Sequence, residues 1–327
     1  MVHNPATGTL QPFNFDQISE MVPELGKFGC NIDAISFNPP LDSSDIGPDI
    51  WVNIATIIYE RYETYDGFVI LHGTDTMAYS ASALSFMLGN LAKPVIFTGS
   101  QLPIGILRTD GKENIITSIE IAAAKENGKP VVPEVCIYFE NKLYRGNRTT
   151  KISTENFNAF QSANYPPLAE VGINIMYNRE AILYPREIKP LKIYPNFDNH
   201  IAILKLFPGM NQAFIDSILG IKGLKGVILE TFGSGNAPAG EWFVKRIRKA
   251  VEHNIIVLDI TQCNTGSVAL GRYETSRKLF EAGVISGYDI TTEAATTKMM
   301  LLFGNYDSLD KIKLLLNSSL KGEITIT

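Results

Sequence analysis

The feature that most constrains the fold is an alternation of short apolar runs with segments of helical period. Residues 66–71 have the pattern of a buried strand, and apolar residues then recur every three or four positions over 77–88. Apolar runs also occupy 94–97 and 135–139, and the helix between them is expected to start at a capping box of Asp110 and Glu113. This alternation predicts a parallel sheet with helices on both faces.

A second series of the same kind follows a weaker, proline-containing stretch at 166–195. Its expected strands and helices alternate in the order 201–207, 214–219, 227–231, 242–253, 255–260 and 277–282, with further helices near 291–303 and 308–319. At roughly 150 residues per domain, a chain of 327 residues is long enough for about two domains. We therefore predict two doubly wound, Rossmann-like α/β domains, a larger one over 1–180 and a smaller one over 196–327, with a connector over 181–195.

Charge and cysteine content argue against several classes of function. Lys plus Arg number 29 and Asp plus Glu 34, which gives a net charge of −5 without a basic block, so no nucleic-acid partner is expected. The longest uncharged run, 76–92, is shorter than the ~20 residues that a membrane span needs. Three widely spaced cysteines and four scattered histidines form no disulfide framework or metal motif. We expect no metal and a reducing, cytoplasmic location.

Polar loops follow the expected strands of the first domain, where ligands bind in doubly wound sheets. One loop runs from His72 to Thr76, another covers 98–101, and a third covers 144–151. A further polar segment, 42–45, precedes an amphipathic stretch at Trp51. Phosphate-binding loops, dinucleotide fingerprints and the serine-hydrolase elbow are absent from the sequence, so we expect no cofactor.

Each of these segments also has a structural interpretation. Residues 74–76 are suited to cap a helix, 43–45 to form a cap or turn, and His72 to make structural hydrogen bonds. Arg145, Arg148 and Lys151 are of types that usually lie on the surface. The catalytic interpretation rests on a combination instead: a hydroxyl group needs an activating base, a lysine with a lowered pKa is such a base, and a carboxylate orients the amine. Thr74, Lys151 and Asp75 supply these three groups.

Six sequence blocks in a fixed order carry a family resemblance. Residues 66–88, DGFVILHGTDTMAYSASALSFML, resemble the second signature of bacterial-type L-asparaginases of the type I, cytoplasmic branch. The blocks DSSDIGPDIW, KPVIFTGSQLP, LYRGNRTTK, GSGNAP and ITQCNTG are similar to the same family in the right order. The resemblance implies hydrolysis of L-asparagine to L-aspartate and ammonia through a threonine acyl-enzyme, with weaker activity on L-glutamine. It also implies that Thr74, Asp75 and Lys151 form the catalytic group.

The resemblance further implies how the substrate is held. Asp75 would bind the α-ammonium group, Ser43 and Ser44 would contact the α-carboxylate, and Gly73 and Thr74 would lie beside the side-chain amide. A zwitterionic amino acid needs such a pairing of an anion with hydrogen-bond donors.

Four residues matter for assembly and regulation under this resemblance. Asn236 matches a residue that reaches into the neighbouring subunit's site, which implies a homo-oligomer built from intimate dimers, usually a tetramer. Thr150, Glu230 and Cys263 match an allosteric asparagine site. An arginine is typical where Glu230 stands, and a glutamate would repel the ligand's carboxylate, which argues against allostery by asparagine.

The family's first signature, Thr-Gly-Gly-Thr-Ile-Gly, carries the usual primary nucleophile, and the chain starts just after its place in the alignment. We expect a missing segment rather than a natural truncation, because loss of the first strand would leave its neighbours unpaired in the core. Two alternatives to an asparaginase stay open. One is the asparaginase-like subunit of a tRNA-dependent amidotransferase, which would carry an extra N-terminal domain, and the other is a non-catalytic amino-acid binder.

Overall fold

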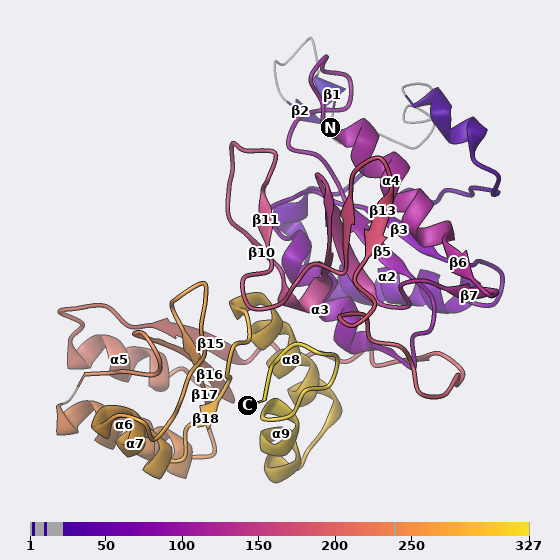
Figure 1. Cartoon of the computed structure of the whole chain (residues 1–327). Helices are drawn as coiled ribbons and strands as arrows, with labels where there is room; N and C mark the ends of the chain where they lie inside the picture. The colour runs from indigo at the N-terminus through magenta and orange to yellow at the C-terminus, as the bar shows by residue number, and fades with distance from the viewer. Residues whose placement is uncertain (1, 4–9, 12–21, 239, 327) are drawn as a thin grey trace. The chain divides into compact units, whose positions relative to one another are not determined.

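The computed structural model describes residues 2–3, 10–11, 22–238 and 240–326, and the chain divides into two compact units. Unit 1 comprises Met1–Ser162 and Pro166–Ile193, and unit 2 comprises Ala163–Tyr165 and Tyr194–Thr327. Each unit has its own central sheet (Figure 1). Strand β14 (Lys192–Ile193), from the segment expected to form a connector, pairs with β4 (Leu88–Gly89) and so belongs to unit 1.

The sheet of unit 1 is half parallel and half antiparallel. Strands β3 (Phe68–Leu71), β5 (Val95–Thr98) and β8 (Val135–Phe139) run parallel, which confirms the parallel sheet expected from their apolar runs. Strands β9 (Lys142–Arg145), β12 (Ala169–Val171) and β13 (Ile175–Tyr177) extend it on the β8 side, each antiparallel to its neighbour. The carboxyl ends of β3, β5 and β8 therefore meet at one edge, where ligands bind in such sheets.

Among the described residues of unit 1, three α-helices contribute to the core: α2 (Pro48–Arg61), α3 (Met77–Met87) and α4 (Gly111–Ala123). All five residues of β8 are buried, which requires cover on both faces of the sheet, and both α3 and α4 pack on β5 and β8. Every residue of α3 except Tyr79 is buried. Ile115 and Ile119 of α4 pack against Val22 and Leu25.

The expected capping box at the start of α4 is wrong. Asp110 does occupy the N-cap position, but its side chain makes no capping hydrogen bond. Its carboxylate accepts from the backbone N–H groups of Gln101 at 2.9 Å and Leu102 at 3.1 Å instead. The Asp110 carboxylate therefore stabilises the turn after β5 rather than the start of the helix.

The other elements that the structure describes in unit 1 are short. They are β1 (Val2–His3), β2 (Leu10–Gln11), η1 (Pro23–Lys27), η2 (Ser43–Asp45), β6 (Lys125–Glu126), β7 (Lys129–Pro130), η3 (Gly146–Arg148), β10 (Thr150–Lys151) and β11 (Phe160–Gln161).

Unit 2 has four parallel strands in the order β15 (Ile201–Lys205), β16 (Gly226–Thr231), β17 (Ile256–Thr261) and β18 (Ile285–Ser286). Its helices are α5 (Gln212–Leu219), α6 (Glu241–Glu252), α7 (Glu274–Glu281), α8 (Thr292–Asn305) and α9 (Leu309–Leu316). All of these elements except β18 match the predicted alternation of strands and helices to within a few residues, and the two-residue strand β18 was not predicted.

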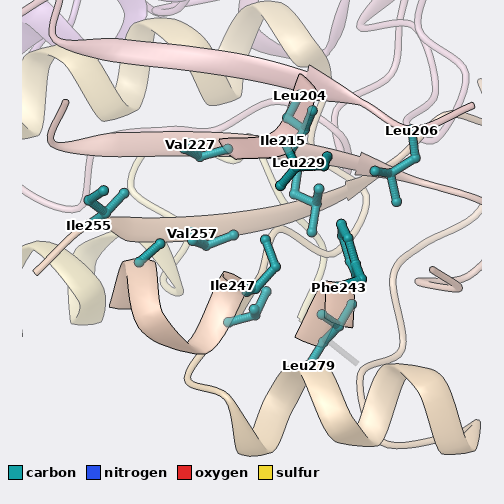
Figure 2. Close-up of a cluster of buried hydrophobic side chains, with 12 residues drawn as sticks. Leu204, Leu206, Ile215, Val227, Leu229, Phe243, Ile247, Ile255, Val257 and Leu279 are labelled. Atoms are coloured by element: carbon teal, nitrogen blue, oxygen red, sulfur yellow. The ribbon is translucent and has the colours of Figure 1, made fainter. Parts of the chain in front are cut away.

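Helices cover both faces of the unit 2 sheet. Val227 and Leu229 of β16 point into a buried cluster with side chains of α5, α6 and α7 (Figure 2). Gly226, one residue along the strand, faces the other way, and a Cβ atom there would lie 2.5 Å from Met299 Sδ of α8. The doubly wound arrangement expected of this part of the chain is therefore present. Within the described ranges, no helix combines the length and the apolar character needed to span a membrane.

Candidate active site

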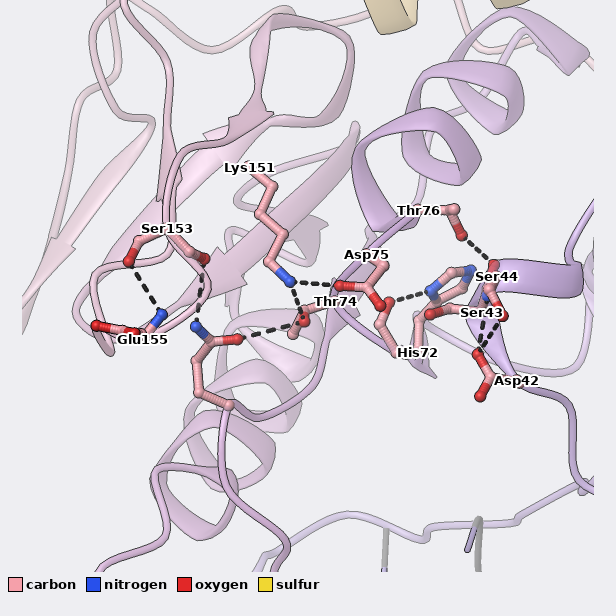
Figure 3. Close-up of polar contacts among 12 residues, drawn as sticks. Asp42, Ser43, Ser44, His72, Thr74, Asp75, Thr76, Lys151, Ser153 and Glu155 are labelled. Carbon is pink, nitrogen blue, oxygen red and sulfur yellow. Dashed lines mark hydrogen bonds and ion pairs between the residues drawn. The ribbon is translucent and has the colours of Figure 1, made fainter. Parts of the chain in front are cut away.

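Three side chains from two separate segments of unit 1 meet at one point (Figure 3). The amine Nζ of Lys151 donates to Thr74 Oγ1 at 2.8 Å and pairs with Asp75 Oδ1 at 2.6 Å. The Lys151 side chain is 16% exposed, whereas that of Asp75 is 67% exposed. The amine is thus held between a hydroxyl group and a carboxylate, with the carboxylate open to an incoming ligand.

Thr74 and Asp75 lie in the loop that joins β3 to α3. Thr76 occupies the N-cap position of α3 but makes no side-chain cap, so the capping interpretation of this residue is wrong. Its hydroxyl group donates to the carbonyl oxygen of Ser43 at 2.6 Å, which ties the loop to η2. The first backbone N–H groups of any helix lack partners within the helix, and those of α3 begin directly after Thr76.

Lys151 reaches this loop by a route that the sequence did not indicate. Tyr144 and Arg145 belong to the antiparallel strand β9 rather than to a loop directly after β8. The chain then passes through η3 into β10, which pairs with β11 and carries Lys151. Arg145 and Arg148 are buried, contrary to the surface interpretation, and Arg145 Nε pairs with Glu134 Oε2 at 2.7 Å.

Ser43 and Gly73 are in direct contact. A Cβ atom on Gly73 would lie 2.5 Å from Ser43 Oγ and 2.7 Å from Ser43 Cβ, so only glycine fits beside this serine. Ser43 is buried, whereas Ser44 is exposed and donates its hydroxyl group to Asp42 Oδ1 at 2.8 Å. Asp42 also accepts the backbone N–H of Ser44, so the turn interpretation of 43–45 is right.

His72 is a structural histidine, as its alternative interpretation held. Its Nδ1 lies 2.6 Å from the carbonyl oxygen of Gly73, which only accepts, so Nδ1 carries a hydrogen. Its Nε2 lies 2.9 Å from Ser80 Oγ, which accepts from Trp51 Nε1 at 2.9 Å. Burial lowers the pKa of His72, opposed by the hydrogen bond to Gly73. The neutral ring links α2 and α3 to the backbone of the site loop.

Gln101 is a site residue to which the sequence analysis gave no role. Thr74 Oγ1 donates to its side-chain oxygen at 3.3 Å, and its amide nitrogen donates to the carbonyl oxygens of Ser153 at 3.3 Å and Asn156 at 3.0 Å. A cavity of about 390 Å³ lies beside it, lined by Asp75, Lys151 and residues 152–156. Gln101 follows β5 at the carboxyl edge of the sheet, and this position is the sequence signal that could have identified it as a site residue.

The other predicted residues are distributed over both units. Thr150 precedes Lys151 in unit 1, whereas Asn236, Glu230 and Cys263 lie in unit 2. Glu230 is buried, accepts from the Thr292 hydroxyl group at 2.8 Å and pairs with Lys205, so its carboxylate is engaged within its own unit. Cys263 is an exposed free thiol. The assembly and allosteric roles of these residues stay predictions.

Among the residues that the structure describes, no three His, Cys, Asp or Glu side chains are grouped so as to hold a metal ion.

Two family models together cover most of the chain. The model described as "Asparaginase, N-terminal" matches residues 1–183, and "Glutaminase/Asparaginase C-terminal domain" matches residues 200–316. The chain belongs to the asparaginase family. The resemblance of the six sequence blocks to this family is thus confirmed.

Relatives of known name place the chain near the type I asparaginases. It is 42% identical to L-asparaginase 1 of Escherichia coli over 88% of this chain and 83% of that protein. The crystal structure of L-asparaginase I from Vibrio cholerae superposes with a TM-score of 0.87 at 40% identity, covering 95% of this chain and 92% of that one.

Two other relatives of the chain are not named as asparaginases. The 60 kDa lysophospholipase of Mus musculus is 42% identical over 88% of this chain, which spans 50% of that longer protein. One subunit of the glutamyl-tRNA(Gln) amidotransferase of Pyrococcus abyssi is more distant, at 32% identity over 98% of this chain and 73% of that protein.

Proposed function

We propose that the chain is an amidohydrolase that converts L-asparagine to L-aspartate and ammonia, with weaker activity on L-glutamine. The observation that carries this proposal is the position of Lys151 Nζ between Thr74 Oγ1 and Asp75 Oδ1. Relatives named L-asparaginase, at 42% identity over most of the chain, support it.

The proposed chemistry runs through a threonine ester. The hydroxyl oxygen of Thr74 attacks the side-chain amide carbon, and the hydroxyl proton passes to the amine of Lys151. Lys151 then delivers the proton to the leaving nitrogen, so that ammonia departs and an acyl-enzyme forms. A water molecule cleaves the ester, which releases L-aspartate and restores the Thr74 hydroxyl group. Backbone N–H groups at the start of α3 are suited to stabilise the negative oxygen.

Substrate orientation follows from the charges around this group. Asp75, two-thirds exposed, binds the α-ammonium group of the amino acid while it also orients the Lys151 amine. Ser43 and Ser44 bind the α-carboxylate, and Gly73 lies beside the side-chain amide together with Thr74. The contact between Ser43 and Gly73 supports this arrangement, because it joins the carboxylate end of the pocket to its amide end.

Ammonia release from L-asparagine by the variants Thr74→Ala and Lys151→Met tests the proposal. Each should lower kcat by about 10²–10⁴-fold while calorimetry still detects asparagine binding. Lys129→Met, an exposed lysine of unit 1, is the matched control and should leave kcat unchanged. Lysophosphatidylcholine is a second substrate to assay, because one relative is named a lysophospholipase.

Other outcomes of the same assay would contradict the proposal. A folded wild-type protein that binds asparagine without releasing ammonia would be a non-catalytic amino-acid binder. A stable complex with a coexpressed amidotransferase partner protein, recovered by pull-down, would instead favour the tRNA-dependent enzyme.

We also propose a cytoplasmic homo-oligomer of intimate dimers, in which Asn236 reaches the neighbouring subunit's site. The three cysteines are free thiols, which supports a reducing compartment. Cell fractionation tests the location, and recovery of the protein outside the cytoplasm would contradict it.

A further inference from the structure

A carboxyl group is buried at the carboxyl end of the unit 2 sheet. Asp259 of β17 is 0% exposed. Its Oδ1 accepts from the Thr231 hydroxyl group of β16 at 2.7 Å, whereas its Oδ2 has no hydrogen-bond partner among the described residues. A buried oxygen of this kind is costly to leave unpaired, and far more costly when it carries charge.

The turn that carries Asn236 lies directly on this carboxyl group. The turn begins after β16, where the backbone N–H of Asn236 donates to the carbonyl oxygen of Phe232 at 2.8 Å and the N–H of Phe232 donates back at 2.9 Å. Gly235 has a φ of +109°, and a Cβ atom there would lie 3.3 Å from Asp259 Oδ2. The Gly235 backbone therefore packs directly on the Asp259 carboxyl group.

Further hydrogen bonds hold the rest of the turn. The Thr261 hydroxyl group donates to the carbonyl oxygen of Gly233 at 2.5 Å. The backbone N–H of Ala269 donates to the carbonyl oxygen of Ser234 at 3.0 Å. The direction in which Asn236 is presented therefore depends on β17 and on the segment at 268–270.

The described side chains around the Asp259 carboxyl group carry no compensating charge. Thr231 faces it from β16, and its partner in the register of β18 is Ser286. The same Cβ position on Gly235 that lies close to Asp259 Oδ2 also lies 3.2 Å from Val268 Cγ1 and 3.8 Å from Leu270 Cδ2. The same sheet face continues into the apolar cluster around Val257 and Leu229 (Figure 2). None of these side chains titrates. Burial raises the pKa of Asp259 to about 7, opposed by the hydrogen bond from Thr231.

We propose that Asp259 is a positioning residue whose neutral carboxyl group supports the turn that presents Asn236, and whose ionisation loosens that turn and limits activity at alkaline pH. This inference rests on the proposed function, because it assigns Asn236 a place in the neighbour's site. An ionised Oδ2 is stabilised only if water reaches it. Because the Gly235 backbone packs over Oδ2, that backbone has to move before water can enter.

The test compares wild-type oligomer with Asp259→Asn, which keeps the shape and the acceptor for Thr231 but cannot ionise. The ratio of variant to wild-type kcat/KM for L-asparagine should rise about tenfold from about pH 6.5 to 8.5, since groups shared by both proteins cancel in the ratio. Asp216→Asn, an exposed acid of α5 that pairs with Arg246, is the matched control and should give a constant ratio.

Hydrogen exchange of the Gly235 and Asn236 amides gives a second readout that needs no substrate. Their protection in the wild type should fall about tenfold or more over the same pH range, after correction for the intrinsic rate, and should not fall in Asp259→Asn. Thr231→Val serves if Asp259→Asn does not fold. This variant lacks the hydrogen bond that favours the charged form of Asp259. The pH above which activity and amide protection fall should therefore be higher than in the wild type.

Identical pH profiles and identical exchange in wild type and Asp259→Asn would overturn the inference. If no protein releases ammonia at any pH, the proposed function fails instead, and the exchange comparison alone decides the role of Asp259.

Discussion

Gly73 shows at the scale of one residue how the site loop is fixed. Because an added Cβ would lie 2.5 Å from Ser43 Oγ, the variant Gly73→Ala has to push η2 and the loop apart. We expect Gly73→Ala to lower kcat/KM for L-asparagine by about 100-fold, as a displacement of about 1 Å does in a positioned site. The free energy of unfolding should fall by about 1–3 kcal/mol, measured by urea denaturation.

Two further variants make this prediction specific. Gly172→Ala adds a methyl group where no atom lies within 4 Å and should leave both quantities unchanged. Ser43→Gly in the Gly73→Ala background removes the clash, so stability should recover while kcat/KM stays low for lack of the Ser43 hydroxyl group. Equal stability of Gly73→Ala and Gly172→Ala would refute the contact.

At the scale of elements, periodicity predicted the helices and parallel strands well, because their apolar spacing reflects burial directly. It missed that β9 runs back antiparallel, since Lys142–Arg145 has the composition of a loop and its buried arginine is stabilised by Glu134, 11 residues away. Asp110 failed as a cap for a similar reason: its partners lie eight and nine residues away in another turn. The meeting of Lys151 with Thr74 and Asp75 depends on this same long-range folding.

The C-terminal segment is tied to α8 by an ion pair that is buried completely. Lys298 Nζ lies 2.6 Å from Glu323 Oε1, with both side chains 0% exposed, and Glu323 also accepts from the N–H groups of Leu320 and Lys321. Lys298→Met leaves that carboxylate buried without its cation. It should lower the free energy of unfolding by about 3–5 kcal/mol in chemical denaturation.

The double variant Lys298→Met, Glu323→Gln should recover much of that loss, because the glutamine oxygen still accepts from the backbone and no charge is buried. Lys278→Met breaks the exposed pair with Glu274 and should cost at most about 0.5 kcal/mol. A cost for Lys298→Met as small as that of Lys278→Met would show that the buried pair does not hold the segment.

At the scale of the whole molecule, the proposed exchange of Asn236 between subunits predicts complementation. Lys151→Met and Asn236→Ala should each be nearly inactive alone. After mixing, unfolding and refolding together, about half of the dimers are mixed, and each mixed dimer holds one site with both residues intact. Ammonia release should therefore return to about a quarter of the wild-type value.

The same refolded mixture tests whether Asn236 serves the site of its own chain or that of the neighbouring subunit. If Asn236 serves the site of its own chain, every mixed dimer has two defective sites and activity does not return. Refolding each variant alone is the control, and sedimentation equilibrium verifies that dimers formed.

The neutral Asp259 also has a calorimetric consequence. The carboxyl group keeps its proton up to about pH 7 in the native protein, against an ordinary pKa of 3.8. Between these values, folding draws about one hydrogen ion from solution, which the buffer has to release. The apparent heat of unfolding will therefore differ between buffers that have unequal enthalpies of ionisation.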